Sequence, residues 1–207
     1  MTTCDILLVG VGGQGVLTIG DLLLRAAFAA DRPASFCPTK GMAQRGGFVK
    51  AELRLGADGV GPRIGMNGAD IAAAMERSEA LQAIPFIKQG GDFLLYDHVW
   101  EPARVQLGID EYPAFDDVSD AITAAGARLT VLRPDDLPVI DGKPVAPNVV
   151  LLGALLGLPS LSKFLGAAEV ESVIATRWPK SAGPNLEAFR WGLAAHGSSG
   201  GMRDGDF

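Results

Sequence analysis

The hydrophobic and polar positions follow two periodicities in turn, and these predict strands and helices that alternate along the chain. The segment CDILLVG, which begins at Cys4, is a continuous apolar run that ends in glycine. Such a run is typical of a strand buried on both faces of a sheet. After Gly13 the apolar positions change to helical spacing. The predicted helix buries one face, made of Val16, Ile19, Leu23, Ala26 and Ala27.

Further strands are predicted from short apolar or alternating runs, over 34–38, 48–56, 69–75, 92–97 and 127–133. Apolar and polar residues alternate along 48–56, so we expect this strand to be half exposed.

Helices are predicted over 79–88, after a cap at Ser78 and before two glycines, and over 117–125. From Asn148 onward the pattern is mostly helical. Strands that alternate with helices predict an α/β fold of three Rossmann-like layers, a mostly parallel sheet flanked by helices, with a helical C-terminal third. We expect residues 1–196 to form a single domain and the glycine- and serine-rich segment 197–207 to be a flexible tail.

Composition narrows the classes of function. Hydrophobic residues make up 48% of the 207 residues and charged residues 20%, which indicates apolar surface covered by a partner. The net charge of −6 argues against nucleic-acid binding. The N-terminus lacks the basic residues of a signal peptide, and the longest apolar stretch is shorter than the ~18 residues of a membrane span. We therefore expect a cytoplasmic protein without a membrane partner.

Cys4 and Cys37 are the two cysteines of the chain. Two thiols are too few for an iron–sulfur cluster, which takes about four, or for a cysteine-rich zinc site. Cys4 starts the first predicted strand and Cys37 lies near the end of the second. These are opposite ends of a parallel pair, so we expect no disulfide.

A glycine-rich turn follows the first strand, where Gly10, Gly12 and Gly15 fit the pattern G-x-G-x-x-G. Such a turn lets a phosphate approach bare backbone at the start of a helix, although any tight strand-to-helix turn also favours glycine. A dinucleotide site further needs a carboxylate at the end of the second strand. That strand ends in Cys37, Pro38 and Thr39. The sequence therefore disfavours NAD and favours an anion or a partner loop at the turn.

A second unusual segment is the loop predicted over 38–47, which contains KGMAQRGG. Gly46 and Gly47, just before a strand, indicate a bulge or a place where another backbone comes close. Arg45 is either a forked donor for a carboxylate or phosphate or an ordinary surface arginine. The topology places this loop at the same sheet edge as the first glycine turn, so both can face one site.

Five motifs occur in the order found in the gamma-type domain of 2-oxoacid:ferredoxin oxidoreductases: GVGGQGVLTIGDLL, GMAQRGGFVKAELRLG, ADIAAAMERSEAL, IKQGGDFLLYD and APNVVLLGALLGL. The chain resembles this family from about Cys4 to Ala194. The form GMAQRGG is similar to that of the small (beta) subunits of indolepyruvate ferredoxin oxidoreductases, where the resemblance is strongest.

The resemblance implies a subunit of a heteromeric enzyme that oxidatively decarboxylates an arylpyruvate, or a related 2-oxoacid, to an acyl-CoA. Thiamine diphosphate, Mg and iron–sulfur clusters are then expected on a large partner subunit, and ferredoxin or another acceptor takes electrons through that subunit. This chain is expected to bind no cofactor alone, and coenzyme A is implied as a substrate shared with the partner. A stand-alone nucleotide- or CoA-binding module stays open, as does a subunit of a related 2-oxoacid oxidoreductase. An independent NAD-dependent dehydrogenase is the weakest alternative.

The resemblance also implies which residues face the cofactor or active site: Gly10, Gly12, Gly13, Gln14, Gly15, Lys40, Gln44, Arg45, Gly46, Gly47 and Asn148. None of them is implied as catalytic or as a metal ligand. Lys40 departs from the family, which usually has histidine before GMAQRGG.

Several of the matched residues also have a plain structural interpretation. Glu76 and Glu79 match an acidic pair of the family but also suit the first turn of a helix. Asn148 suits a helix cap. His98 and His196 have no carboxylate companions in the sequence, so we predict no catalytic role for them. The tryptophans are expected to be core or interface anchors: Trp100, Trp178 and Trp191.

Overall fold

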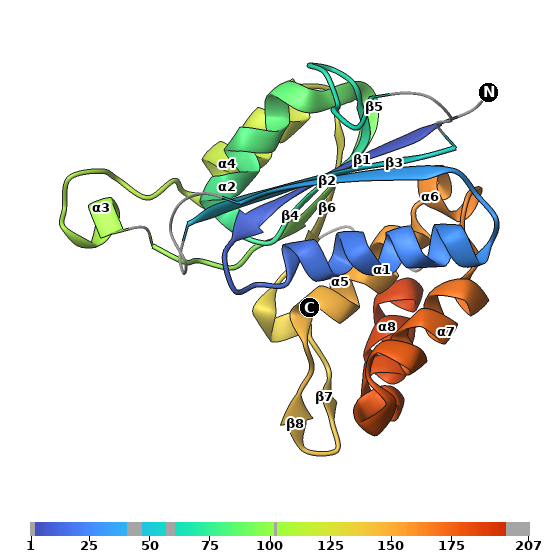
Figure 1. The fold of residues 1–207 in the computed structure, drawn as a ribbon. Helices are drawn as coiled ribbons and strands as arrows, with labels where there is room; N and C mark the ends of the chain where they lie inside the picture. Colours follow the sequence, from blue (N-terminus) through green and yellow to red (C-terminus); the bar gives the residue numbers. More distant parts are fainter. Residues whose placement is uncertain (1–2, 41–46, 57–60, 102, 198–207) are drawn as a thin grey trace.

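Six strands form a mixed sheet in the order β2-β3-β1-β4-β5-β6 (Figure 1). Their bounds are Cys4–Val11 (β1), Ala34–Lys40 (β2), Phe48–Leu55 (β3), Ala69–Ala74 (β4), Ile87–Tyr96 (β5) and Arg128–Leu132 (β6). β1, β4, β5 and β6 pair in parallel, whereas β3 is antiparallel to both of its neighbours. The mostly parallel sheet predicted from the sequence is confirmed.

The computed structural model describes the chain apart from residues 1–2, 41–46, 57–60, 102 and 198–207. The tail predicted for 197–207 lies outside the described residues except for Gly197, which ends the last helix. None of the helices within the described ranges is long and apolar enough to cross a membrane.

Helices cover both faces of the sheet (Figure 1). One face carries α1 (Val16–Ala29), α5 (Pro147–Gly157), α7 (Ala167–Arg177) and α8 (Ala182–Gly197), and the other carries α2 (Arg77–Ala83) and α4 (Phe115–Ala124). Alternate residues of β1 point to opposite faces. Ile6 and Leu8 therefore join the core under α1 and α5, and Leu7 and Val9 join the core under α2 and α4.

Short elements complete the chain. They are α3 (Ala103–Gln106), α6 (Pro159–Ser162), the 3-10 turns Ile84–Phe86, Pro134–Asp136 and Pro179–Ser181, and the hairpin of β7 (Val139–Ile140) and β8 (Lys143–Pro144). The C-terminal third is helical, as predicted. Every residue of α5 from Val149 to Leu156 is buried. This helix contacts both α1 and α8, and a helix enclosed in this way is apolar on all sides.

The helix predicted over 79–88 is wrong at both ends. α2 begins at Arg77, because the carboxylate of Glu76 and not the hydroxyl of Ser78 accepts the capping bond, from the backbone N–H of Glu79. It ends at Ala83, before a 3-10 turn that contains Pro85. The two glycines expected to end it lie inside β5.

β2 is longer than predicted and does not neighbour β1. It runs on through Pro38 to Lys40, which the sequence analysis assigned to a loop. Proline is tolerated there because β2 is an edge strand of the sheet. β3 separates β2 from β1, so the place beside β1 where a Rossmann fold holds its ribose carboxylate is taken by another strand. Cys4 and Cys37 are free thiols, as expected, although their strands form no pair.

β3 is more buried than the predicted half-exposed strand. Glu52, on its polar side, is fully buried. Its Oε2 accepts a 2.5 Å hydrogen bond from the backbone N–H of Ile64, and its Oε1 lies 2.9 Å from Nζ of Lys50. The segment that contains Ile64 therefore covers the polar side of β3.

Candidate functional site

The glycine turn between β1 and α1 lies at the carboxyl ends of the parallel strands. Gly13 and Gly15 have φ values of 108° and 86°, which glycine adopts without the steric cost paid by other residues. α1 then begins at Val16, and no side chain caps its N-terminus. The backbone N–H groups of its first turn therefore present partial positive charge beyond the sheet edge.

The side chain of Gln14 links this turn by hydrogen bonds to the end of the neighbouring strand β4. Its Oε1 accepts a 2.8 Å hydrogen bond from the N–H of Val11, and its Nε2 donates a 2.8 Å bond to the carbonyl of Met75. The same Nε2 lies 3.5 Å from Nδ1 of His98. One side chain thus links the ends of β1, β4 and the segment after β5.

A backbone hydrogen bond connects the second glycine motif, which ends at Gly47, with the first. The N–H of Gly12 donates a 2.8 Å hydrogen bond to the carbonyl of Gly47, so another backbone does come close at Gly47, as predicted. Lys40 ends β2 opposite Val49, but its side chain lies outside the described residues, as do Gln44, Arg45 and Gly46.

Asn148 brings a second helix N-terminus to the turn. It lies in the first turn of α5, after Pro147. A Cβ built on Gly15 would lie 2.5 Å from Nδ2 of Asn148, so the side chain packs directly against the glycine. The expectation that Asn148 caps the helix is wrong: the N-cap residue is Ala146, and no side chain caps α5.

A cavity of about 540 Å³ opens at this point. Its described lining consists of Gly12, Gly13, Gln14, Met75, Tyr96, His98, Trp100, Pro147 and Asn148. The uncapped N-termini of α1 and α5 both border it, while none of these residues is Asp, Glu, Lys or Arg. Among the described lining residues, an anionic group would therefore meet backbone N–H groups and amide side chains.

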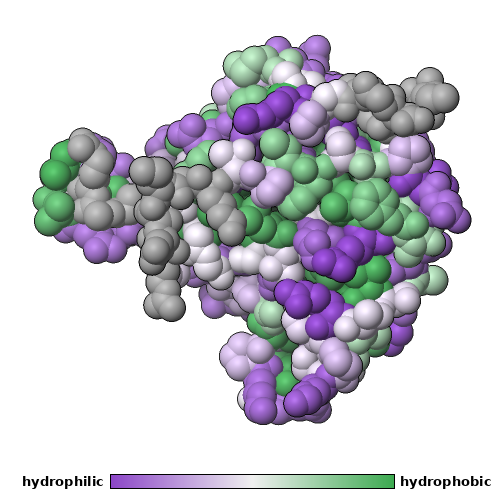
Figure 2. Space-filling model, in the orientation of Figure 1, coloured by the Kyte–Doolittle hydropathy of each residue, from purple (hydrophilic) through white to green (hydrophobic). Residues whose placement is uncertain are grey.

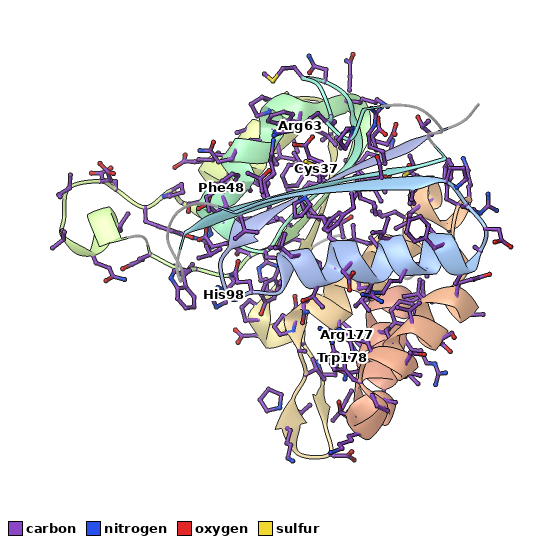
Figure 3. The ribbon with its side chains drawn as sticks, in the orientation of Figure 1. Cys37, Phe48, Arg63, His98, Arg177 and Trp178 are labelled. Carbon is purple, nitrogen blue, oxygen red and sulfur yellow. The ribbon has the colours of Figure 1, made fainter. Side chains whose placement is uncertain are left out.

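Three rings form one wall of the cavity. Tyr96 and His98 stack with centroids 5.8 Å apart at 11°, and His98 and Trp100 lie 6.4 Å apart at 36°. Figure 3 shows His98 near the start of α1. Burial, and next the charge of Asp135, raises the pKa of Tyr96, which keeps its phenol neutral. These rings offer a planar apolar surface beside the helix N-termini.

His98 lines the cavity although the sequence predicts no role for it. A signal was present, because rings occupy alternate positions directly after a buried parallel strand, in YDHVW. Trp100 both lines the cavity and stays 47% exposed, whereas Trp178 and Trp191 pack against the core as expected. The side chain of His196 lies outside the described residues.

Glu76 forms hydrogen bonds with several segments near the cavity but is not among the residues that line it. Its fully buried carboxylate accepts hydrogen bonds from Ser78 Oγ at 2.6 Å, from the N–H of Glu79 at 2.9 Å, from the N–H of Trp100 at 3.2 Å and from the hydroxyl of Tyr112. Burial, together with the charge of Glu76, raises the pKa of Glu79 to about 7. Glu76 thus holds these segments together. A carboxylate suits this position because it caps α2 and accepts all four of these hydrogen bonds.

This chain is similar in sequence to a known family of oxidoreductases. The profile of the pyruvate ferredoxin/flavodoxin oxidoreductase family matches residues 5–195. The indolepyruvate oxidoreductase subunit IorB of Archaeoglobus fulgidus is 34% identical over 189 residues, which are 91% of this chain and 92% of that protein.

Two solved structures share the fold. The pyruvate oxidoreductase subunit PORC of Thermotoga maritima has a TM-score of 0.69 at 19% identity, over 94% of this chain and 97% of that one. The 2-oxoglutarate:ferredoxin oxidoreductase of Magnetococcus marinus, solved with 2-oxoglutarate, coenzyme A and succinyl-CoA bound, has a TM-score of 0.64 at 20% identity. All of this chain matches 32% of that longer one, so the fold occurs both as a separate subunit and as part of a larger chain.

Proposed function

This chain belongs to the pyruvate ferredoxin/flavodoxin oxidoreductase family, and from that premise we propose that it is the small subunit of an indolepyruvate-type 2-oxoacid:ferredoxin oxidoreductase. The reaction converts a 2-oxoacid and coenzyme A into an acyl-CoA, carbon dioxide and a proton, and it delivers two electrons to ferredoxin or another acceptor. We treat residues 1–196 as one gamma-type domain, followed by a tail over 197–207.

The observation that carries this proposal is similarity over most of both chains. The alignment with the Archaeoglobus subunit covers 91% of this chain and 92% of that protein. Relatives from Thermococcus and Pyrococcus bear the same subunit name at 32% identity over 94% of the chain.

The described residues of the cavity lining do not fit a Mg–diphosphate cofactor held by them alone. Mg²⁺ in such sites is bound by carboxylate and carbonyl oxygens, yet the described lining has no carboxylate. The described residues also contain no group of three or more metal-ligating side chains. We therefore place thiamine diphosphate, Mg and the iron–sulfur clusters on the large partner subunit, where thiamine supplies the carbon–carbon cleavage chemistry.

We assign this chain a part in binding and shielding. The N–H groups at the start of α1 and the N–H of Asn148 in α5 can hold a carboxylate or phosphate of the substrates, since Pro147 has no N–H and those of Val149 and Val150 donate to Ala146. The Asn148 amide is placed to orient it, Gln14 holds the turn in shape through its bonds to Val11 and Met75, and the rings of Tyr96, His98 and Trp100 keep water from the planar parts of the ligand. Coenzyme A is the substrate we expect to be shared with the partner.

We propose that residues of both glycine motifs face the active site. The assignment of Lys40, Gln44, Arg45 and Gly46 rests on the sequence alone. Gly10, Gly15 and Gly47 contribute by shaping the turn, since Gly15 makes room for Asn148 and Gly47 accepts the bond from Gly12.

Co-purification tests the proposal. The tagged chain, isolated from cells that produce it, should bring down a larger chain that carries iron–sulfur absorbance and thiamine diphosphate. The complex should reduce ferredoxin or a viologen dye only when both a 2-oxoacid and coenzyme A are present, with indolepyruvate and phenylpyruvate preferred over pyruvate and 2-oxoglutarate. A stable isolated chain that binds NAD, a flavin or coenzyme A tightly, and that recruits no larger chain, would instead support the stand-alone binding module.

A further inference from the structure

A segment between β5 and α4 projects from the body of the protein and carries α3 near its tip (Figure 1). We call residues 97–114 the arm. Among the large hydrophobic side chains that are exposed in the described part of the chain, the arm contributes Val99 (44% exposed), Trp100 (47%), Leu107 (73%) and Ile109 (57%). The remaining such side chains are distributed over separate elements: Phe28, Met66, Leu81 and Val139. Figure 2 shows hydrophobic surface at the end of the arm, beside hydrophilic atoms.

The base of the arm is firmly attached. Trp100, on the outgoing side, and Tyr112, on the returning side, both donate to Oε1 of the buried carboxylate of Glu76. Arg77, the next residue, binds Asp97 through two hydrogen bonds of 2.6 and 3.1 Å, and its guanidinium lies 5.8 Å from the centroid of the Tyr112 ring. The arm therefore leaves the body from fixed points at both ends.

Leu107 and Ile109 are exposed near the end of the arm, and Val99 and Trp100 are half exposed at its base. Such surface is typical of a site that another protein covers. We propose that the arm patch, defined as Val99, Trp100, Leu107 and Ile109, docks this chain onto the large subunit of the same enzyme; this inference rests on the function proposed above.

Charge favours that partner over a second copy of this chain. Glu101 and Glu111 are exposed on the arm beside the apolar residues, so the surface that receives it should be an apolar groove with a basic rim. In a symmetric dimer formed through the arm, Glu101 and Glu111 of both copies would lie in one interface and repel each other. Trp100 belongs both to the patch and to the cavity wall, so a chain seated on the patch also reaches the mouth of the cavity. Binding of the large subunit to the arm patch would then also close the cavity.

The test uses co-expression with a tagged large subunit, followed by measurement of how much of this chain is recovered with it. The variant Leu107→Ser/Ile109→Ser replaces the two most exposed residues of the arm patch. The matched control, Phe28→Ser/Val139→Ser, changes side chains of similar exposure (57% and 67%) away from the arm. Buried apolar anchors dominate the affinity of protein interfaces. We therefore expect the arm variant to lower recovery at least tenfold and the control to leave it unchanged, with wild-type melting temperatures for both isolated chains.

The outcomes separate the two proposals. If the tagged large subunit recovers none of the wild-type chain, the proposed function fails and the docking surface with it. If the wild-type complex forms and the arm variant is recovered as well as the control, the function stands and the docking surface is wrong. Conversion of a wild-type dimer of this chain to a monomer by the arm substitutions would also overturn the inference, in favour of a second copy.

Discussion

The backbone N–H of Gly12 donates a 2.8 Å hydrogen bond to the carbonyl oxygen of Gly47, which joins two glycine motifs that lie far apart in the sequence. The bond extends the antiparallel pairing of β1 and β3 beyond its last pair, Val11 and Phe48. The same turn is fastened on its other side by Gln14. The end of the cavity is therefore fixed by backbone and amide contacts, and its shape should respond to single substitutions in the turn.

Gly15→Ala should destabilise the protein more than Gly13→Ala. Both glycines have positive φ, so each substitution carries a backbone cost of about 1–2 kcal/mol. A Cβ on Gly13 meets nothing within 4 Å, whereas one on Gly15 meets Nδ2 of Asn148 at 2.5 Å. The clash adds about 1–3 kcal/mol, measurable as the free energy of unfolding in urea.

A double-mutant cycle checks the cause of that difference. In the Gly15→Ala background, Asn148→Ala should recover the part of the loss that comes from the clash. Strictly additive effects of the two substitutions would show that the amide does not press on the glycine.

Gln14→Ala should lower the free energy of unfolding by about 1–3 kcal/mol, because a partly buried N–H at Val11 and carbonyl at Met75 lose their partners. Gln106→Ala is the matched control, since that glutamine is exposed and donates to the carbonyl of Glu101, which is also exposed. Equal losses for the two variants, measured by chemical denaturation, would show that Gln14 does not hold the turn.

Glu79 should make stability depend on pH. Its pKa is raised from 4.5 to about 7 by burial and by Glu76, so the folded state holds this proton more tightly than the unfolded state. Its contribution to stability is complete below about pH 4.5 and is lost as the pH rises through about 7. Relative to Glu79→Gln, the wild type should lose stability across that window. Parallel curves for the two proteins would contradict the raised pKa.

Arg54→Met should be strongly destabilising without harming the cavity. Arg54 binds both carboxylate oxygens of Asp5 at 2.9 and 3.0 Å, and the two side chains are only 16% and 8% exposed. Removing one partner leaves a buried charge, at a cost of about 3 kcal/mol or more. The exposed pair of Arg25 and Asp21 supplies the control, since Arg25→Met should change the melting temperature little. Similar melting temperatures for the two variants would refute this account of the Asp5 pair.

The parts of the fold that the sequence predicts well are those where local pattern and tertiary setting agree. β1 is apolar throughout because helices cover both faces, and α1 follows it through a turn that needs glycine. α2 was misplaced because its cap is the carboxylate of Glu76, whose backbone is extended (φ −152°, ψ 140°), and glutamate is not among the usual capping residues. Gly90 and Gly91 resemble a helix end but lie in β5, where the pairing with β4 changes register.

The sequence predicts the parts of the candidate site that belong to local motifs and misses the part that depends on tertiary structure. Gly12, Gly13, Gln14 and Asn148 come from motifs with recognisable spacing, and all four border the cavity. The ring of His98 borders it too, but its neighbours are set by the course of the chain after β5, which a search for carboxylate companions in the sequence does not reveal. The position of β3 between β1 and β2 also depends on tertiary structure and cannot be read from local sequence. Because of it, β2 does not lie beside β1, where a dinucleotide-binding fold needs its second strand.

The most direct test of the central claim, that this cavity is part of the active site of the assembled enzyme, is steady-state kinetics of the complex that contains His98→Ala. The substitution removes one ring of the cavity wall while the backbone bond from His98 N–H to the carbonyl of Tyr96 can stay. We expect unchanged co-purification with the large subunit and a fall of at least tenfold in kcat/KM for the 2-oxoacid, for coenzyme A or for both. Wild-type kcat/KM for both substrates in a correctly assembled complex would contradict the claim.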